Sequence, residues 1–191
     1  MLSREAIEKM FVDAGALLEG HFLLTSGRHS NRYMQCAQVL QYPAYTEALS
    51  RILADRFRND GVDVVVGPAM GGIIVAYEVA RQLGVRGIFC ERENGVMTLR
   101  RGFSIQPGER ILVVEDVITT GGSVMEVMEV TKARGGEVVG VAVLVDRSGG
   151  KVDLGLRTEA ALVMEIDSWE ADSCPLCREG TLPITKPGSR K

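Results

Sequence analysis

The fold is decided by the sequence R-I-L-V-V-E-D-V-I-T-T-G-G-S, which runs from Arg110 to Ser123. Its four apolar residues, Ile111 to Val114, are typical of a parallel strand that is buried on both faces. Two acids, Glu115 and Asp116, end this apolar run, and a turn of small and hydroxyl-bearing residues then opens a helical pattern. We therefore expect a buried strand that delivers two carboxylates to its carboxyl end, followed by the N-terminus of a helix.

The turn from Thr119 to Ser123 has the composition of a phosphate site. Gly121 and Gly122 allow backbone N–H groups to approach a ligand without a Cβ in the way, and the hydroxyl groups add further donors. The two acids cannot hold a phosphate, because charges of the same sign repel. They could instead accept hydrogen bonds from sugar hydroxyls or support Mg²⁺. A phosphate loop beside such a pair of acids describes a site for a ribose 5-phosphate.

The composition is that of a soluble globular domain. The chain has 191 residues, of which 46% are hydrophobic and 25% are charged, and its formal net charge is −3. A single domain is expected from this length. The weak negative charge gives no global attraction to nucleic acid or to an anionic membrane. No apolar run reaches the length of a membrane span, and the N-terminus lacks the apolar core of a signal peptide. We therefore expect a cytoplasmic protein that binds neither nucleic acid nor a membrane.

Strand and helix patterns alternate through the middle of the chain. This alternation predicts an α/β fold with a mainly parallel, twisted sheet flanked by helices, in which ligands bind at the carboxyl ends of the strands. We expect an N-terminal hood in residues 1–42, a core sheet in 62–166 and a C-terminal tail in 168–191. The individual elements are expected as helices at 3–19, 43–60, 73–83 and 123–133, and as strands at 62–66, 87–90, 110–115, 138–145 and 161–166.

The central stretch resembles a known motif through its acids, its hydroxyl-bearing residues and its glycines taken together. They resemble the phosphoribosyl pyrophosphate (PRPP) motif of type I phosphoribosyltransferases, in which an apolar strand and two acids precede T-T-G-x-[ST]. The resemblance implies a PRPP site with Mg²⁺ as the cofactor. The residues that it places against PRPP are Glu115, Asp116, Val117, Ile118, Thr119, Thr120, Gly121, Gly122 and Ser123. An ordinary strand-to-helix turn is the alternative interpretation.

A second glycine-rich turn, Gly67-Pro68-Ala69-Met70-Gly71-Gly72, also follows a strand and precedes a helix, so its amides can face an anion. The resemblance implies that this turn holds the pyrophosphate of PRPP. Family members often carry a Lys here, where this chain has Gly71 or Gly72. The alternative is a tight turn without a ligand.

The acceptor is suggested by residues near the N-terminus. The stretch Phe22 to Ser30 resembles the F-x-L-x-S-G-[RK]-x-S segment of orotate phosphoribosyltransferases, with Ser26 and Arg28 at the matching positions. The same family places an Arg after a later strand, where it pairs with the orotate carboxylate, and Arg147 stands there in this chain. The resemblance implies an orotate site made by Thr119, Arg147, Ser26 and Arg28. A surface Arg is the alternative at position 147.

The long connection from Glu91 to Gly108 is expected to be an active-site lid. Its Arg92, Arg100 and Arg101 would stabilise a departing pyrophosphate and, with Asp116, form the expected catalytic set. In orotate phosphoribosyltransferases this segment is a mobile loop that commonly bears Lys and His and reaches into the neighbouring subunit, which implies a homodimer. This loop has neither residue. A surface hairpin is the alternative, because the apolar and polar residues of the segment alternate.

No metal is expected on the protein itself apart from the Mg²⁺ carried by PRPP. Cys174-Pro-Leu-Cys177 has the spacing of metal ligands but supplies only half of a tetrahedral zinc site. Two such halves across a dimer, or recruitment of Cys36 and Cys90, would complete one. Plain thiols are the favoured interpretation.

The resemblance implies transfer of the 5-phosphoribosyl group from PRPP to N1 of orotate, which gives orotidine 5′-monophosphate and pyrophosphate in pyrimidine synthesis. Two alternatives stay open. One is a phosphoribosyltransferase for a purine base, and the other is a PRPP-sensing regulator of the same fold that binds nucleic acid. The acidic net charge and the lack of a basic run count against the regulator.

Overall fold

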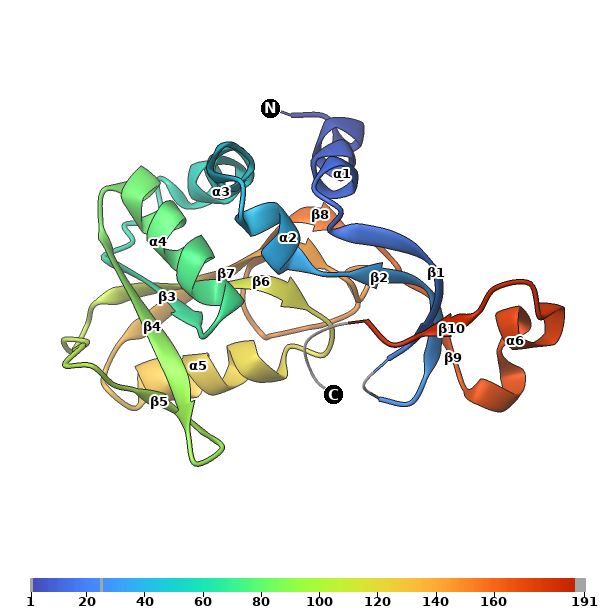
Figure 1. The fold of residues 1–191 in the computed structure, drawn as a ribbon. Helices are drawn as coiled ribbons and strands as arrows, with labels where there is room; N and C mark the ends of the chain where they lie inside the picture. The colour runs from blue at the N-terminus through green and yellow to red at the C-terminus, as the bar shows by residue number, and fades with distance from the viewer. Residues whose placement is uncertain (1, 25, 188–191) are drawn as a thin grey trace.

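The computed structural model describes residues 2–24 and 26–187. Its strands form two sheets, a six-stranded sheet of order β5-β4-β3-β6-β7-β8 and a four-stranded sheet of order β10-β1-β2-β9, which we call the hood sheet (Figure 1). The helices are α1 Arg4–Asp13, α2 Cys36–Leu40, α3 Pro43–Phe57, α4 Gly71–Leu83, α5 Gly122–Lys132 and α6 Pro175–Glu179, with a 3₁₀ turn η1 at Ala171–Ser173. The strands are β1 Leu17–Leu23, β2 His29–Met34, β3 Val64–Pro68, β4 Arg86–Glu93, β5 Val96–Leu99, β6 Arg110–Ile118, β7 Glu137–Asp146, β8 Thr158–Val163, β9 Ser168–Trp169 and β10 Ile184–Thr185.

The expected mainly parallel sheet is confirmed. Strand β6 lies near its centre and pairs in parallel with β3 and β7, while β5 is the antiparallel edge. The apolar run of β6 serves both faces, because successive side chains of a strand point in opposite directions. Leu112 and Val114 belong to the core on one side of the sheet, and Ile111 and Val113 belong to the core on the other. This double burial explains why the run is unbroken rather than alternating.

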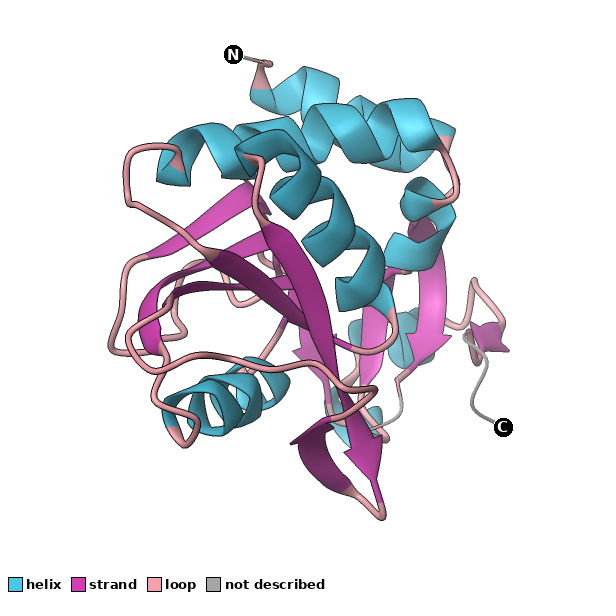
Figure 2. Ribbon diagram, turned by 90° about the vertical axis from the view of Figure 1, so that its left-hand side faces the viewer, coloured by secondary structure: helices cyan, strands magenta, loops and turns pink. Residues whose placement is uncertain are grey.

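Helices cover both faces of this sheet. Helices α2, α3 and α4 lie together over one face, and α5 lies alone on the opposite face (Figures 1 and 2). Helix α5 begins where β6 ends, so the phosphate loop predicted from the sequence lies at the carboxyl edge of the sheet.

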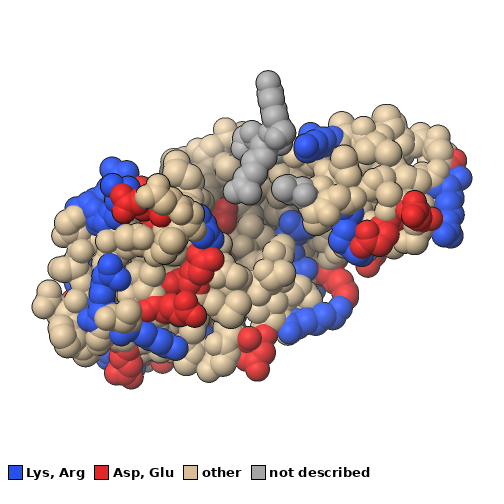
Figure 3. Space-filling model, turned by 90° about the horizontal axis from the view of Figure 1, so that it is seen from below, with Lys and Arg blue, Asp and Glu red and all other residues tan. Residues whose placement is uncertain are grey.

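Charged side chains of both signs are interspersed on the face seen from below, where the core and the hood lie side by side (Figure 3). This face therefore shows no field of a single sign. None of the helices in the described part of the chain is both long and apolar enough to span a membrane.

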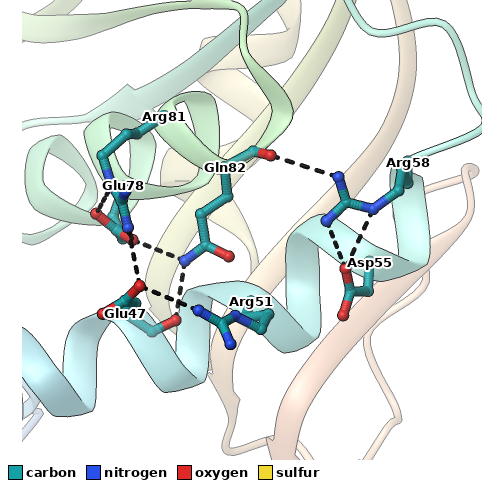
Figure 4. A network of polar contacts seen from close by, with 7 residues as sticks. All are labelled: Glu47, Arg51, Asp55, Arg58, Glu78, Arg81 and Gln82. Atoms are coloured by element: carbon teal, nitrogen blue, oxygen red, sulfur yellow. Dashed lines mark hydrogen bonds and ion pairs between the residues drawn. The ribbon is translucent and has the colours of Figure 1, made fainter.

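A polar network joins α3 to α4 on the outside of the core (Figure 4). Arg81 pairs with Glu78 at 2.7 Å and with Glu47 at 3.2 Å, and the Gln82 amide donates to the Glu47 carbonyl at 2.9 Å. Hydrogen bonds from Arg81 lower the pKa of Glu78. The network fixes the orientation of α4, whose N-terminal turn belongs to the candidate site described below.

Two expectations about the ends of the chain are wrong. The helix expected at 3–19 ends at Asp13, because Gly15 takes a φ of +65° and the next residues enter β1. The segment expected as a tail instead adds β9 and β10 to the two edges of the hood sheet. Its last four residues, 188–191, lie outside the described residues, as does Thr25 in the stretch taken to bind the acceptor.

Candidate active site

Glu115 and Asp116 lie near the carboxyl end of β6, as the sequence predicts. Glu115 is buried, with 8% of its surface exposed, and Asp116 is half-buried. Burial and the neighbouring Asp116 carboxylate raise the pKa of Glu115 from 4.5 to about 9, and burial raises the pKa of Asp116. The backbone N–H of Val117 donates to Asp116 Oδ1 at 2.9 Å, which fixes the orientation of that carboxylate. The pair is thus a buried acidic centre that would be stabilised by hydrogen-bond donors or by a cation.

The turn between β3 and α4 packs directly against these acids. A Cβ on Gly71 would lie 2.1 Å from Asp116 Oδ2, and one on Gly72 would lie 2.8 Å from Pro68 Cδ and 3.3 Å from Glu115 Oε1. Only glycine fits at position 71 without displacing the carboxylate. The structure therefore brings both predicted glycines to the acids.

The loop from Thr119 to Ser123 forms a pocket of about 250 Å³ together with Glu115 and Arg92. Gly121 takes a φ of +79°, and a Cβ there would lie 2.7 Å from Leu154 Cδ2, so the position requires glycine. The pocket opens at the N-terminus of α5, where the first backbone N–H groups have no partner within the helix and the helix dipole favours an anion. Its size and polarity suit one phosphate group. The predicted residues Val117, Ile118, Thr120 and Gly122 also line it.

The expected lid is a paired hairpin over much of its length. Strands β4 and β5 are antiparallel and meet at Asn94 and Gly95, both of which have positive φ. Met97 and Leu99 are buried in the core beneath α5. Residues 91–99 therefore belong to a hairpin, for which the Asn-Gly pair is the sequence signal, and the role of the segment as a lid stays a prediction.

The three arginines of this hairpin do not converge on one point within the chain. Arg92 pairs with Glu126 of α5 at 2.8 Å and lines the phosphate pocket. Arg101 instead pairs with Glu91 at 3.0 Å, and Arg100 pairs with Glu93 at 3.1 Å. The joint pyrophosphate role of these arginines stays a prediction, and for Arg100 and Arg101 it depends on the second chain of the expected dimer.

Arg147 follows β7 and lies next to the phosphate loop, since its backbone N–H donates to the Ile118 carbonyl at 2.9 Å. Its side chain is half-buried, and Nε has no hydrogen-bond partner among the described residues. Burial lowers the pKa of the guanidinium, and Cys36 and Tyr33 are close enough to act on its charge. A buried guanidinium nitrogen without a partner is costly unless a ligand completes it. Arg147 is therefore placed to receive an anionic group between the sheet and the hood.

Arg28, by contrast, is already engaged. Its guanidinium donates to the hydroxyl of Ser168 at 2.9 Å, to the Ser168 carbonyl and to Glu170. These contacts tie the loop before β2 to β9, and the role of Arg28 in binding the acceptor stays a prediction. Ser26 is exposed in the same loop, and its role stays a prediction.

The cysteines do not group as the sequence suggested. Cys36 lies near the Asp116 carbonyl, and Cys90 is buried in the core beneath α5, so neither joins the pair in the C-terminal segment. Cys174 and Cys177 instead meet the chain's two histidines, His21 and His29. Sequence reasoning missed these histidines because more than a hundred residues separate them from the cysteines.

A larger hollow of about 500 Å³ lies beside α3, lined by Ala48, Ile52 and Arg56 among others. It contains neither the acids nor the phosphate loop. We therefore place the candidate site in the smaller pocket, which the phosphate loop and Glu115 line.

The acid pair predicts an unusual pH dependence of stability in the absence of a ligand. Because the folded-state pKa of Glu115 is raised, its contribution to stability is present below pH 4.5 and is lost as the pH rises toward 9. Glu115→Gln mimics the protonated form, so its melting temperature at pH 8 should exceed that of the parent by about 3 °C or more. Thermal unfolding from pH 5 to 9 measures this effect, with the exposed Glu129→Gln as a control. Parallel curves for Glu115→Gln and the parent would contradict it.

Comparison with known proteins agrees with this geometry. Residues 35–155 match the family model described as "Phosphoribosyl transferase domain". The orotate phosphoribosyltransferase of Pelotomaculum thermopropionicum is 67% identical over 190 residues, which cover all of both chains, and that of Desulforamulus reducens is 65% identical over 100% of this chain and 99% of its own. Among solved structures, orotate phosphoribosyltransferase from Aeropyrum pernix aligns with a TM-score of 0.67 at 29% identity, covering 82% of this chain and 93% of that one.

Proposed function

The chain belongs to the orotate phosphoribosyltransferase family, and we propose that it transfers the 5-phosphoribosyl group of PRPP to N1 of orotate at the carboxyl edge of its six-stranded sheet. The products are orotidine 5′-monophosphate and pyrophosphate. The reaction belongs to pyrimidine nucleotide synthesis.

In the donor half of the site, we assign PRPP to two glycine-containing turns and to the acid pair. The loop from Thr119 to Ser123 holds the 5′-phosphate through its backbone amides and hydroxyls, and Arg92 adds a positive charge to the same pocket. Glu115 and Asp116 accept hydrogen bonds from the ribose hydroxyls. The turn containing Gly71 and Gly72 presents its backbone to the pyrophosphate, and its contact with the acids brings the pyrophosphate and the ribose together.

The demanding step is breakage of the bond between C1 of the ribose and the pyrophosphate oxygen. Positive charge builds on the ribosyl carbon, and negative charge builds on the leaving group, as in glycosyl transfer. N1 of orotate gives up its proton to solvent and forms the new bond to C1 from the opposite face, with inversion and without a covalent enzyme intermediate. The carboxylate of Asp116 fixes the ribose in line with N1, which is the positioning that this step requires.

The acid pair also fits the Mg²⁺ that the family implies. Two buried carboxylates whose pKa values are raised by burial are oxygen donors that a cation would stabilise. Glu115 and Asp116 would hold it, directly or through water, beside the ribose. When bound with PRPP, Mg²⁺ supplies neutralisation of the charge that builds on the pyrophosphate.

One observation favours orotate over a purine base as the acceptor. Arg147 Nε, next to the phosphate loop, lacks a partner among the residues that the structure describes, and a planar guanidinium of this kind matches a carboxylate, which orotate carries and the purine bases lack. We assign the hydroxyls of Thr119, at the start of the loop, and of Ser26, in the hood, as further contacts of orotate. Tyr33 offers a ring surface near Arg147.

The experiment that tests this function is PRPP-dependent consumption of orotate with Mg²⁺, measured beside adenine, hypoxanthine and xanthine. Turnover of a purine base instead of orotate would identify the purine alternative. Binding of PRPP without turnover of any base, together with binding to nucleic acid, would identify the regulator. The mixed charges on the face in Figure 3 offer no basic surface there for such a regulator.

We assign the active form as a homodimer, in which the segment 91–108 of one chain reaches the site of the other. Helix α4 supports this, because Met70, Ile74 and Tyr77 form an apolar stripe at helical spacing and are 80%, 44% and 68% exposed. Arg100 and Arg101 would then act on the pyrophosphate of the neighbouring site. None of the four cysteines forms a disulfide among the described residues, which suits a reducing cytoplasm.

The double variant Ile74→Lys/Tyr77→Lys is expected to dissociate the dimer, because it buries two charges in the interface. Size-exclusion chromatography with light scattering should give the mass of one chain, and the turnover should fall. Val12→Lys is the control, since Val12 is 56% exposed on α1, outside the stripe. A monomeric parent, or a double variant that stays dimeric, would reject this interface.

A further inference from the structure

Four metal-binding side chains converge at the hood sheet, outside the site described above. They are His21 on β1, His29 on β2, and Cys174 and Cys177 in the segment between β9 and β10, and their donor atoms all lie within 4.8 Å of one another. All but Cys177 are buried. Donors that are distant in sequence and buried around one point have the composition of a Cys₂His₂ site.

The separations between these atoms are those of ligands around one zinc ion. His21 Nε2 lies 2.9 Å from His29 Nδ1, 3.5 Å from Cys174 Sγ and 3.6 Å from Cys177 Sγ, and the distance from Cys177 Sγ to His29 Nδ1 is 3.2 Å. A tetrahedral site with Zn–N of about 2.0 Å and Zn–S of about 2.3 Å places its donors about 3.3 to 3.8 Å apart. Two of these four distances fall within that range, and the two that involve His29 Nδ1 are shorter by 0.4 Å or less, so the donors are grouped closely enough for one ion to bind all four.

Hydrogen bonds alone do not account for this cluster. A neutral imidazole nitrogen has either one proton or one lone pair, yet His21 Nε2 has three polar neighbours. The other nitrogen of that ring, Nδ1, lies 3.3 Å from the Leu182 carbonyl, which can only accept, so Nδ1 carries the proton. Nε2 then presents its lone pair to the cluster. A hydrogen bond from the second ring nitrogen to a carbonyl is also what metal-bound histidines have.

We propose that His21, His29, Cys174 and Cys177 bind one structural Zn²⁺ ion. The site is closed, because four protein donors fill a tetrahedral shell and leave no position for a substrate. A two-iron cluster does not fit, since its histidines and cysteines bind different irons, whereas here Cys177 Sγ lies 3.2 Å from His29 Nδ1.

The zinc holds a part of the fold that lacks a hydrophobic core of its own. No residue of α6, β9 or β10 belongs to either core cluster of the described residues, and α6 buries none of its side chains. The edge strands β9 and β10 pair with β2 and β1 through only two registered residue pairs each. Small units with so little buried apolar surface need a disulfide or a metal to be stable. The ion joins both histidine strands to the segment that connects the two edges.

The ion also fixes the loop that approaches the acceptor. His21 and His29 lie on either side of the stretch containing Ser26 and Arg28, and Arg28 is anchored to Ser168 and Glu170 of the same C-terminal segment. The metal thus holds both ends of this loop at a fixed separation. This consequence rests on the proposed function, whereas the zinc site itself does not.

The first test is the metal content of the purified full chain, supplied with Zn²⁺ and then dialysed. Mass spectrometry of the elements should find about one zinc per chain. Cys177→Ala should lower the affinity for zinc by more than about 100-fold, because loss of a ligand costs more than loss of its supporting hydrogen bond. Cys90→Ala is the matched control, since it removes a buried thiol elsewhere and should keep the zinc. Cobalt substitution should give the visible bands of a tetrahedral thiolate site in the parent and not in Cys177→Ala.

The second test measures what the metal does. Removal of zinc by a chelator should lower the melting temperature and expose the C-terminal segment to proteolysis, and Zn²⁺ but not Mg²⁺ should restore both. The Michaelis constant for orotate should rise several-fold more than that for PRPP. If the chain turns over no orotate, the metal content and the proteolysis still decide the zinc site. A chain that binds no zinc, one that binds iron in its place, or a Cys177→Ala variant that retains as much zinc as Cys90→Ala would overturn the proposal.

Discussion

Asp116→Asn is expected to lower kcat on the order of 100-fold or more while leaving the fold intact, because misplacement of a reacting carbon by about 1 Å has an effect of that size. Asn has the same shape as Asp, and its oxygen can still accept the hydrogen bond from the Val117 N–H. What is lost is the negative charge that accepts from the ribose hydroxyls and faces the ribosyl carbon. Steady-state kinetics with PRPP and orotate measures the effect, and circular dichroism checks the fold.

Asp63→Asn is the matched control for this change. Asp63 precedes β3 at the opposite edge of the same sheet, where its carboxylate accepts from the Arg110 N–H at 2.9 Å, a bond that Asn can keep. Ligands of parallel sheets bind at the other edge, so this variant should retain full activity. If Asp116→Asn also kept full activity, Asp116 would not be part of the active site.

The core of the fold could be predicted because its signals are local. Three local features each have a single structural use: the apolar run of β6, the two acids that follow it, and the glycines at positions 121 and 122. The structure places them together. The hood was harder to predict. Residues 17 and 18 continue the helical spacing of α1, but Gly15 breaks the helix and pairing with β2 draws them into a strand. Tertiary pairing overrides a short periodic pattern in such cases.

The candidate site divides in the same way. Its donor half follows from one contiguous motif, whereas its acceptor half depends on which arginines are free, and this depends on partners far away in the sequence. Arg28 and Arg147 look equivalent in the sequence, yet β9 engages the first, whereas Nε of the second has no partner among residues 2–24 and 26–187. The zinc ligands pose the same difficulty, since only the pairing of β9 and β10 with the histidine strands brings Cys174 and Cys177 to them.

Arg147→Ala is expected to raise the Michaelis constant for orotate about 10-fold to 100-fold, with a far smaller change for PRPP. A charge-assisted hydrogen bond contributes about 1.5 to 3 kcal/mol, which corresponds to this range. The effect should fall on orotate, because the buried Nε of Arg147 has no hydrogen-bond partner in the described part of the chain and is therefore free for the acceptor. Initial-rate kinetics with each substrate varied in turn separates the two constants.

A comparison between two acceptors makes this assignment specific to the carboxylate. Uracil has the ring of orotate without its carboxylate, so the parent should prefer orotate strongly, and Arg147→Ala should lose most of that preference. Arg147→Lys should lie between the two, since it keeps the charge but not the planar pair of donors. Arg134→Ala, just after the far end of α5, is the control and should keep the parental preference, because its side chain donates to the Val130 carbonyl, away from the loop at the start of that helix. If Arg147→Ala discriminates between orotate and uracil as the parent does, the carboxylate is bound elsewhere, and the unpartnered Nε must then serve the donor half of the site.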